Sequence, residues 1–71
     1  MQSIPIESTA LTAIGYDAAA RLLRIHFTDG RTYEYSHVPP PVHAALMRAD
    51  SKGHFFNIAI RPKYSTRPAT D

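Results

Sequence analysis

The sequence predicts an α+β domain, a three-stranded antiparallel meander covered on one face by one or two short helices. Two segments, 22–27 and 31–36, alternate apolar and polar residues on either side of an Asp29-Gly30 turn, which is typical of a β-hairpin. A proline-rich break follows, and the apolar residues beyond it recur at helical spacings of three and four. A chain of 71 residues is expected to form one domain, 1–71, with a small core.

The first strand of the meander is predicted at residues 11–16. Ile14 and Tyr16 share one face of it, and Gly15 between them indicates a bend or a close backbone approach. Residues 17–20, an aspartate and three alanines, are too few to sustain a helix. We therefore expect a turn there.

The two ends of the chain are expected to add little ordered structure. Ile4 and Ile6 flank Pro5, a pattern compatible with an edge strand because proline cannot donate to a strand ladder. The composition of residues 65–71 is that of a frayed tail. The ordered part is therefore expected to span about residues 6–64.

The turn between the two central strands decides which side chains share a face, because a slip of one residue moves every side chain to the other face. A two-residue loop would place Glu34 opposite Ile25, an acid among apolar residues. A three-residue loop at 28–30, with Gly30 at positive φ, places Tyr33 opposite Ile25 instead. The sequence therefore predicts the three-residue loop.

This loop sets the register of the whole hairpin. It predicts four cross-strand pairs: Leu23 with Tyr35, Arg24 with Glu34, Ile25 with Tyr33, and His26 with Thr32. Tyr33 and Tyr35 then lie on the core side, and Arg24 faces an opposite charge on the other side. We expect that polar face, including Glu34, to meet water.

A first helix is predicted to begin at residues 40–41, because proline suits the first turn of a helix, and to end near 49–50. Its apolar stripe consists of four residues at helical spacing: Val42, Ala45, Leu46 and Ala49. His43 and Arg48 are expected to point outward. Val38, just before the helix, is expected to pack back onto it as a hydrophobic staple.

Residues 55–61 fit two secondary structures. Alternate residues from Phe56 to Ile60 are apolar, as on a strand, but Phe56, Ile60 and Tyr64 are also four apart, as on a helix. Ser51 is a suitable N-cap for the helical alternative. The periodicity leaves both alternatives open.

Several short motifs follow one another between residues 6 and 64. They are Ile14-Gly15-Tyr16-Asp17, Leu23-Arg24-Ile25-His26-Phe27, Asp29-Gly30, Tyr33-Glu34-Tyr35, Val38-Pro39, Ala49-Asp50-Ser51-Lys52-Gly53, and Phe56-Asn57 with Ile60-Arg61 and Tyr64. Together they resemble the KTSC domain, which occurs at the C-terminus of some lysyl-tRNA synthetases and as a stand-alone bacterial protein. The most specific mark of that family is a tyrosine-x-tyrosine motif, matched by Tyr33 and Tyr35.

The resemblance implies the fold of that family and a partner class. RNA binding has been suggested for the family from its synthetase context. The resemblance also favours the helical alternative for residues 55–61, because Asn57, Arg61 and Tyr64 stand in helical phase.

Composition limits the remaining function classes. Eight lysines and arginines against six acids give a formal charge of +2, which permits a phosphate-bearing partner. The absence of cysteine excludes disulfides and thiolate metal sites, and the four histidines match no compact ligand motif, so no metal or other cofactor is expected. The sequence has no apolar run of membrane-spanning length and no signal peptide, so we expect a cytoplasmic protein without membrane association.

The candidate nucleic-acid contacts are the basic residues and one tyrosine: Arg31, Lys52, Arg61, Lys63, Tyr64 and Arg67. Tyr33 and Tyr35 could stack on bases, but the predicted register favours a role in the core. Arg24 is expected to pair with Glu34 rather than with a ligand.

Two serine–histidine combinations, Ser36 with His37 and Ser51 with His54, have no evident third catalytic member. We therefore expect no catalytic residues and no enzymatic activity. The leading hypothesis is a non-catalytic binding module for RNA, in particular tRNA. The alternative is a protein-interaction or homo-oligomerisation module, because so small a core often gains stability by association.

Overall fold

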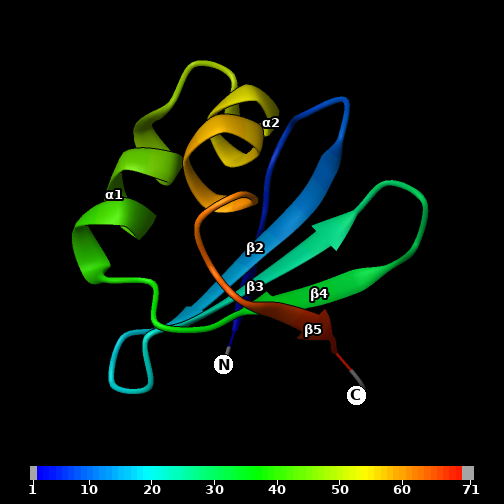
Figure 1. Ribbon diagram of the computed structural model, residues 1–71. Helices are drawn as coiled ribbons and strands as arrows, with labels where there is room; N and C mark the ends of the chain where they lie inside the picture. Colours follow the sequence, from blue (N-terminus) through cyan, green and yellow to red (C-terminus); the bar gives the residue numbers. More distant parts are fainter. Residues whose placement is uncertain (1, 70–71) are drawn as a thin grey trace.

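The structure is a computed structural model that describes residues 2–69. One antiparallel sheet has the strand order β1-β2-β3-β4-β5, and the helices cover one of its faces (Figure 1). The elements are β1 Ser3–Pro5, β2 Leu11–Asp17, β3 Leu22–Phe27, β4 Thr32–Tyr35, α1 Pro40–Arg48, α2 Lys52–Phe55, the π-helix η1 Phe56–Ile60, and β5 Thr66–Pro68. The predicted α+β class and its helix-covered meander, here β2-β3-β4, are confirmed. Two short outer strands extend the meander.

The central hairpin has the predicted register. Its pairs are Leu23 with Tyr35, Arg24 with Glu34, Ile25 with Tyr33, and His26 with Thr32. The N–H of Phe27 donates to the carbonyl oxygen of Arg31 at 2.8 Å, which closes the three-residue loop, and Gly30 has a φ of 91°. Both the loop length and the positive φ of Gly30 were predicted correctly.

The turn before β3 is also where the sequence predicts it. Oδ1 of Asp17 accepts hydrogen bonds from the N–H groups of Ala19 and Ala20, at 3.1 and 3.2 Å. A carboxylate that binds the backbone two and three residues ahead stabilises such a turn. The chain then enters β3.

Helix α1 begins at Pro40, as predicted, and ends at Arg48, one residue before the predicted end. Leu46 and Val38 are fully buried, as the stripe and the staple require. The prediction that His43 points outward was wrong. Its ring stacks on that of Tyr16 with centroids 4.3 Å apart, and the Tyr16 hydroxyl donates to the carbonyl oxygen of Val38 at 2.6 Å.

The segment after Ser51 is helical, so the helical alternative was correct. The Ser51 hydroxyl accepts from the N–H of His54 at 3.3 Å and caps α2, which continues directly into η1. The N–H of Arg61 reaches the carbonyl oxygen of Phe56 at 2.9 Å, five residues back. This arrangement buries both Phe56 and Ile60 against the sheet.

The ends of the chain are more ordered than predicted. β1 pairs with β2 from residue 3, so order begins before residue 6. The expectation of a frayed tail was wrong for β5, which pairs with β4. The carbonyl oxygen of Ser65 and the N–H of Ala69 also bind the backbone of Ser36 and Thr32, each at 2.9 Å. The free edge of β4 supplies these partners; Thr70 and Asp71, also predicted as tail, lie outside the described residues.

One core joins the sheet to the helices. Its buried members come from three strands, two helices and the segment before α1: Leu11, Ile14, Leu23, Ile25, Tyr35, Val38, Leu46, Phe56 and Ile60. Within residues 2–69, the structure has no helix of the length and apolarity needed to cross a membrane.

Gly30→Ala should lower the free energy of unfolding by about 1–2 kcal/mol, because a side chain is strained in left-handed backbone. A Cβ at this position would meet no atom within 4 Å apart from its chain neighbours, so the loss would come from the backbone alone. Urea denaturation measures the difference. A Gly30→Ala protein as stable as the wild type would contradict the bulged loop.

Gly53→Ala in α2 is the matched control. Its Cβ would lie 3.4 Å from the Cβ of Ala10, an ordinary contact, and Gly53 has no left-handed backbone. Alanine is the better helix former, so this variant should be as stable as the wild type or more stable by up to about 1 kcal/mol.

Candidate nucleic-acid interface

A hollow of about 260 Å³ opens where the central hairpin meets the end of η1 and the start of β5. Its lining consists of Phe27, Asp29, Arg31, Tyr33, Tyr35, Arg61 and Thr66. Side chains two apart on a strand share a face, so β4 presents both tyrosines of the tyrosine-x-tyrosine motif to the same side. Arg61, the first residue after η1, reaches the hollow from the helical layer.

Edge-to-face contacts hold the aromatic wall of the hollow in place. The ring of Phe27 meets Tyr33 at 5.8 Å and Phe56 at 5.5 Å, and Phe56 meets Tyr35 at 5.2 Å between centroids. Such edge contacts are the favoured geometry for aromatic pairs. Tyr33 and Tyr35 therefore belong to the core, as the register predicts, and also line the hollow.

Two guanidinium groups border this wall. The side chain of Arg31 is 72% exposed, and its Nε lies 3.8 Å from a carboxylate oxygen of Asp29. A surface pair of this kind contributes little stability, so a ligand can compete with it. Arg61 donates one hydrogen bond, at 3.3 Å, to Oδ1 of Asn57. A guanidinium has five N–H donors, so this bond leaves capacity for an anion.

The other candidate contacts lie elsewhere. The Lys52 ammonium donates to the carbonyl oxygen of Ala49 at 3.1 Å, at the start of α2. Lys63 is exposed in the turn after η1, where Tyr64 packs against the core. Arg67 binds Glu34 at the outer face of the sheet. Of the six candidates, the structure brings Arg31 and Arg61 together.

Three residues of the hollow did not appear among the sequence-based candidates. Phe27 was placed at the end of the predicted strand 22–27, Asp29 in the turn and Thr66 in the tail. The hairpin register could have identified the first of these, because it places Phe27 beside Tyr33 on the same face. No sequence signal indicated Thr66, because its position depends on the pairing of β5 with β4.

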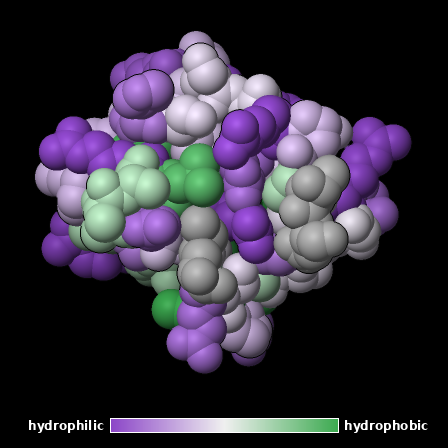
Figure 2. All heavy atoms as spheres, turned by 90° about the horizontal axis from the view of Figure 1, so that it is seen from below, coloured by the Kyte–Doolittle hydropathy of each residue, from purple (hydrophilic) through white to green (hydrophobic). Residues whose placement is uncertain are grey.

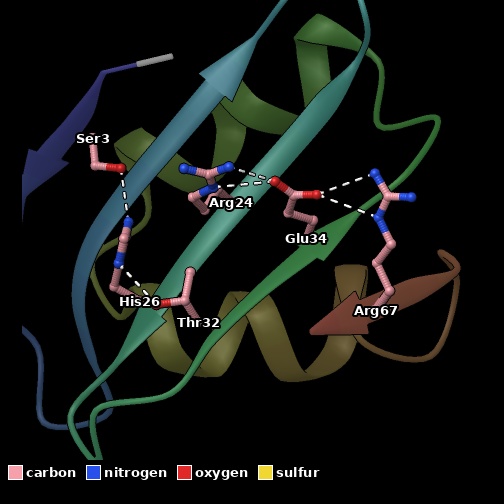
Figure 3. Close-up of polar contacts among 6 residues, drawn as sticks. All are labelled: Ser3, Arg24, His26, Thr32, Glu34 and Arg67. Carbon is pink, nitrogen blue, oxygen red and sulfur yellow. Dashed lines mark hydrogen bonds and ion pairs between the residues drawn. The ribbon is translucent and has the colours of Figure 1, made fainter. Parts of the chain in front are cut away.

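The outer face of the sheet carries a network that supports this hollow from behind. Figure 2 shows the molecule from below, the side away from the helices, where hydrophilic residues lie beside a smaller hydrophobic patch. In Figure 3, Arg24 and Arg67 approach Glu34 from opposite sides. The Glu34 carboxylate accepts from Nη2 of Arg24 at 2.6 Å and from Nε and Nη2 of Arg67, both at 3.3 Å.

The expectation that Glu34 meets water was therefore wrong. Glu34 is only 7% exposed, because two guanidinium groups cover its carboxylate. The hydrogen bond from Arg24 is the main reason that the pKa of Glu34 lies below its ordinary value, and Arg67 lowers the pKa further. Because Arg67 is next to Thr66, this network also holds the β5 wall of the hollow.

Two of the four histidines, His26 and His43, have side-chain partners within the fold. His26 lies between the hydroxyls of Ser3 and Thr32, at 2.8 and 3.1 Å, and so connects β1, β3 and β4 (Figure 3). Burial lowers the pKa of His43, which favours its neutral form. Within residues 2–69, no three histidine, aspartate or glutamate side chains are grouped to hold a metal ion.

The fold and the hollow define a class of protein, a small α+β domain with two tyrosines of one strand and two arginines around a hollow. The sequence matches the KTSC domain family over residues 7–64, so the chain belongs to that family. The crystal structure of a KTSC domain protein from Yersinia pestis is similar with a TM-score of 0.94 and 39% identity, over 97% of each chain.

Two sequence relatives differ in the share of their own length that this chain matches. A protein of Tsukamurella paurometabola is 45% identical over 60 residues, which cover 84% of this chain and 90% of that protein. A lysine–tRNA ligase of Nostoc punctiforme is 38% identical over 58 residues, which cover 82% of this chain but 10% of the ligase. The description of the matching family names a domain and does not name a catalytic activity.

Glu34→Gln should destabilise the domain at neutral pH by about 1–3 kcal/mol, because hydrogen bonds to a charged acceptor are lost. The lowered pKa of Glu34 means that the carboxylate stabilises the fold above its ordinary pKa of 4.5 and loses this effect as the pH falls through the lowered value. The difference between wild type and variant should therefore shrink on acidification.

Urea unfolding at a series of pH values measures this difference. Glu7→Gln, at an exposed carboxylate outside the network, is the control and should follow the wild type at every pH. A difference between Glu34→Gln and wild type that stays constant down to acid pH would contradict the role of the charged network.

Proposed function

We propose that the protein is a non-catalytic binding module for RNA, with tRNA as the partner class. The observation that carries the proposal is the meeting of Arg31 and Arg61 with Tyr33 and Tyr35 at one hollow. Arginine binds phosphate oxygens with a planar set of donors, and aromatic rings accept unstacked bases. These two properties together are what single-stranded RNA requires of a protein surface.

Two further facts support this proposal. The charge of +2 favours contact with a polyanion while limiting its strength, so binding should be weak and salt-dependent. A related segment is part of a protein described as a lysine–tRNA ligase. A role in tRNA binding implies a cytoplasmic location.

Arg61→Ala should weaken the binding of tRNA and reduce the slope of log K against log salt by about one, because one phosphate contact is lost. Gel-shift or filter-binding titrations at several salt concentrations measure both quantities. Arg48→Ala removes the same charge from α1, away from the hollow, and is the matched control.

Three outcomes distinguish the possibilities. A lower affinity of Arg61→Ala for tRNA, with little change in the affinity of Arg48→Ala, supports binding at the hollow. An equal loss of affinity for tRNA in both variants would indicate a non-specific effect of net charge. The absence of tRNA binding by the wild type at low salt would exclude the proposed function.

Self-association is a second candidate, favoured by two large hydrophobic side chains at the surface. Ile4 on β1 is 55% exposed and Ile58 on η1 is 58% exposed. The edge strands are short and contain Pro5 and Pro68, which disfavours pairing of one sheet with another. An interface would therefore form through side chains.

Sedimentation velocity over a range of protein concentrations tests this candidate. Self-association through η1 should be abolished by Ile58→Ser, with the fold preserved because Ile58 is exposed. A wild type that stays monomeric at the highest concentration would exclude it.

A further inference from the structure

We propose that the hollow binds a single nucleotide unit, with its phosphate between Arg31 and Arg61 and the hydroxyl of Tyr35 as a further donor. This inference deepens the proposed function and rests on it, since unpaired RNA would be the source of the nucleotide.

Within the part of the chain that the structure describes, the hydroxyl of Tyr35 has no hydrogen-bond partner. Tyr35 is 4% exposed, and no hydrogen bond within residues 2–69 involves its hydroxyl. Yet within the same range no fully buried side-chain oxygen or nitrogen is left unpaired. The Tyr35 hydroxyl must therefore keep a small accessible surface, and the hollow is the space that this residue lines.

Tyr16 shows how the same chain pairs a tyrosine that has a structural role. Its hydroxyl donates to the carbonyl oxygen of Val38 at 2.6 Å. Because the Tyr35 hydroxyl makes no hydrogen bond within residues 2–69, phenylalanine would fill the core at position 35 equally well. The hydroxyl of Tyr35 is thus available to a ligand rather than used by the fold.

The groups around the hollow are mainly hydrogen-bond donors. Five of the lining side chains can donate: Arg31, Tyr33, Tyr35, Arg61 and Thr66. Asp29 is the one carboxylate in the lining, and Arg31 already lies beside it. A ligand that fits such a lining is anionic and rich in acceptors, and phosphate has both properties.

The aromatic wall and the volume of the hollow restrict the class of ligand further. Phe27, Tyr33 and Tyr35 form one apolar side of the hollow, which suits a flat ring next to the phosphate. The volume of about 260 Å³ is below the range of roughly 300–1,000 Å³ of drug-sized ligand pockets. A hollow of this size admits one nucleotide that has left its stack, and excludes a base pair.

The test is a competition experiment with labelled tRNA. Uridine 5′-monophosphate, uridine and inorganic phosphate are each added as competitors, and NMR shifts locate the mononucleotide. The nucleotide should compete at least tenfold better than uridine or phosphate alone, and should shift the resonances of Tyr33, Tyr35 and Arg61.

Two tyrosine variants separate binding from folding. Tyr35→Phe should lower the affinity for the mononucleotide about tenfold, because a hydrogen bond to a charged acceptor is lost, with an unchanged or higher melting temperature. Tyr16→Phe should do the reverse, with a lower melting temperature and unchanged affinity. The pair is matched, since each variant removes one hydroxyl from a tyrosine of the sheet.

The possible failures are distinguishable. If tRNA binds equally to wild type and Tyr35→Phe and no mononucleotide competes, the nucleotide site is wrong and RNA binding stands. If the mononucleotide binds at the hollow and tRNA does not bind, the nucleotide site stands and the proposed function is wrong. If phosphate alone, or a phosphorylated peptide, competes as well as the nucleotide, the assignment of the ligand is overturned.

Discussion

The register of the central hairpin is the constraint on which the rest of the structure depends. Gly30 adopts a φ of 91° and closes a loop of three residues between β3 and β4. A slip by one residue would bring Glu34 into the core and turn Tyr33 and Tyr35 to the outer face. The hollow and the outer-face network would then both be lost, because each uses one set of alternating side chains.

The outer-face network extends the sheet beyond what the small core could hold alone. β5 is three residues long and all three are exposed, so its burial of apolar surface contributes little. Backbone pairing with β4 and the two hydrogen bonds from Arg67 to Glu34 hold it in place. Thr66 lies in the lining of the hollow as a result, so the polar network on one face helps to build the site on the other.

A domain of this size uses the same residues for its fold and for its surface site. The ring of Tyr35 packs against Phe56, while its hydroxyl has no partner in the described chain. Tyr33 likewise contacts Phe27 and lines the hollow. The two readings of the tyrosine-x-tyrosine motif, core or ligand surface, are therefore compatible, because the ring and the hydroxyl of one residue meet different environments.

Local patterns in the sequence determined the α+β class, the hairpin register, the start of α1 and the Ser51 cap. These features depend on alternation, on the special backbone of Gly30 and on proline and capping preferences, which act between near neighbours. Only the tertiary structure decided three others. β5 pairs because β4 offers it a free edge, Glu34 is buried because Arg67 arrives from 33 residues away, and His43 stacks on Tyr16 across the fold. Each depends on segments distant in sequence, for which no local pattern carries a signal.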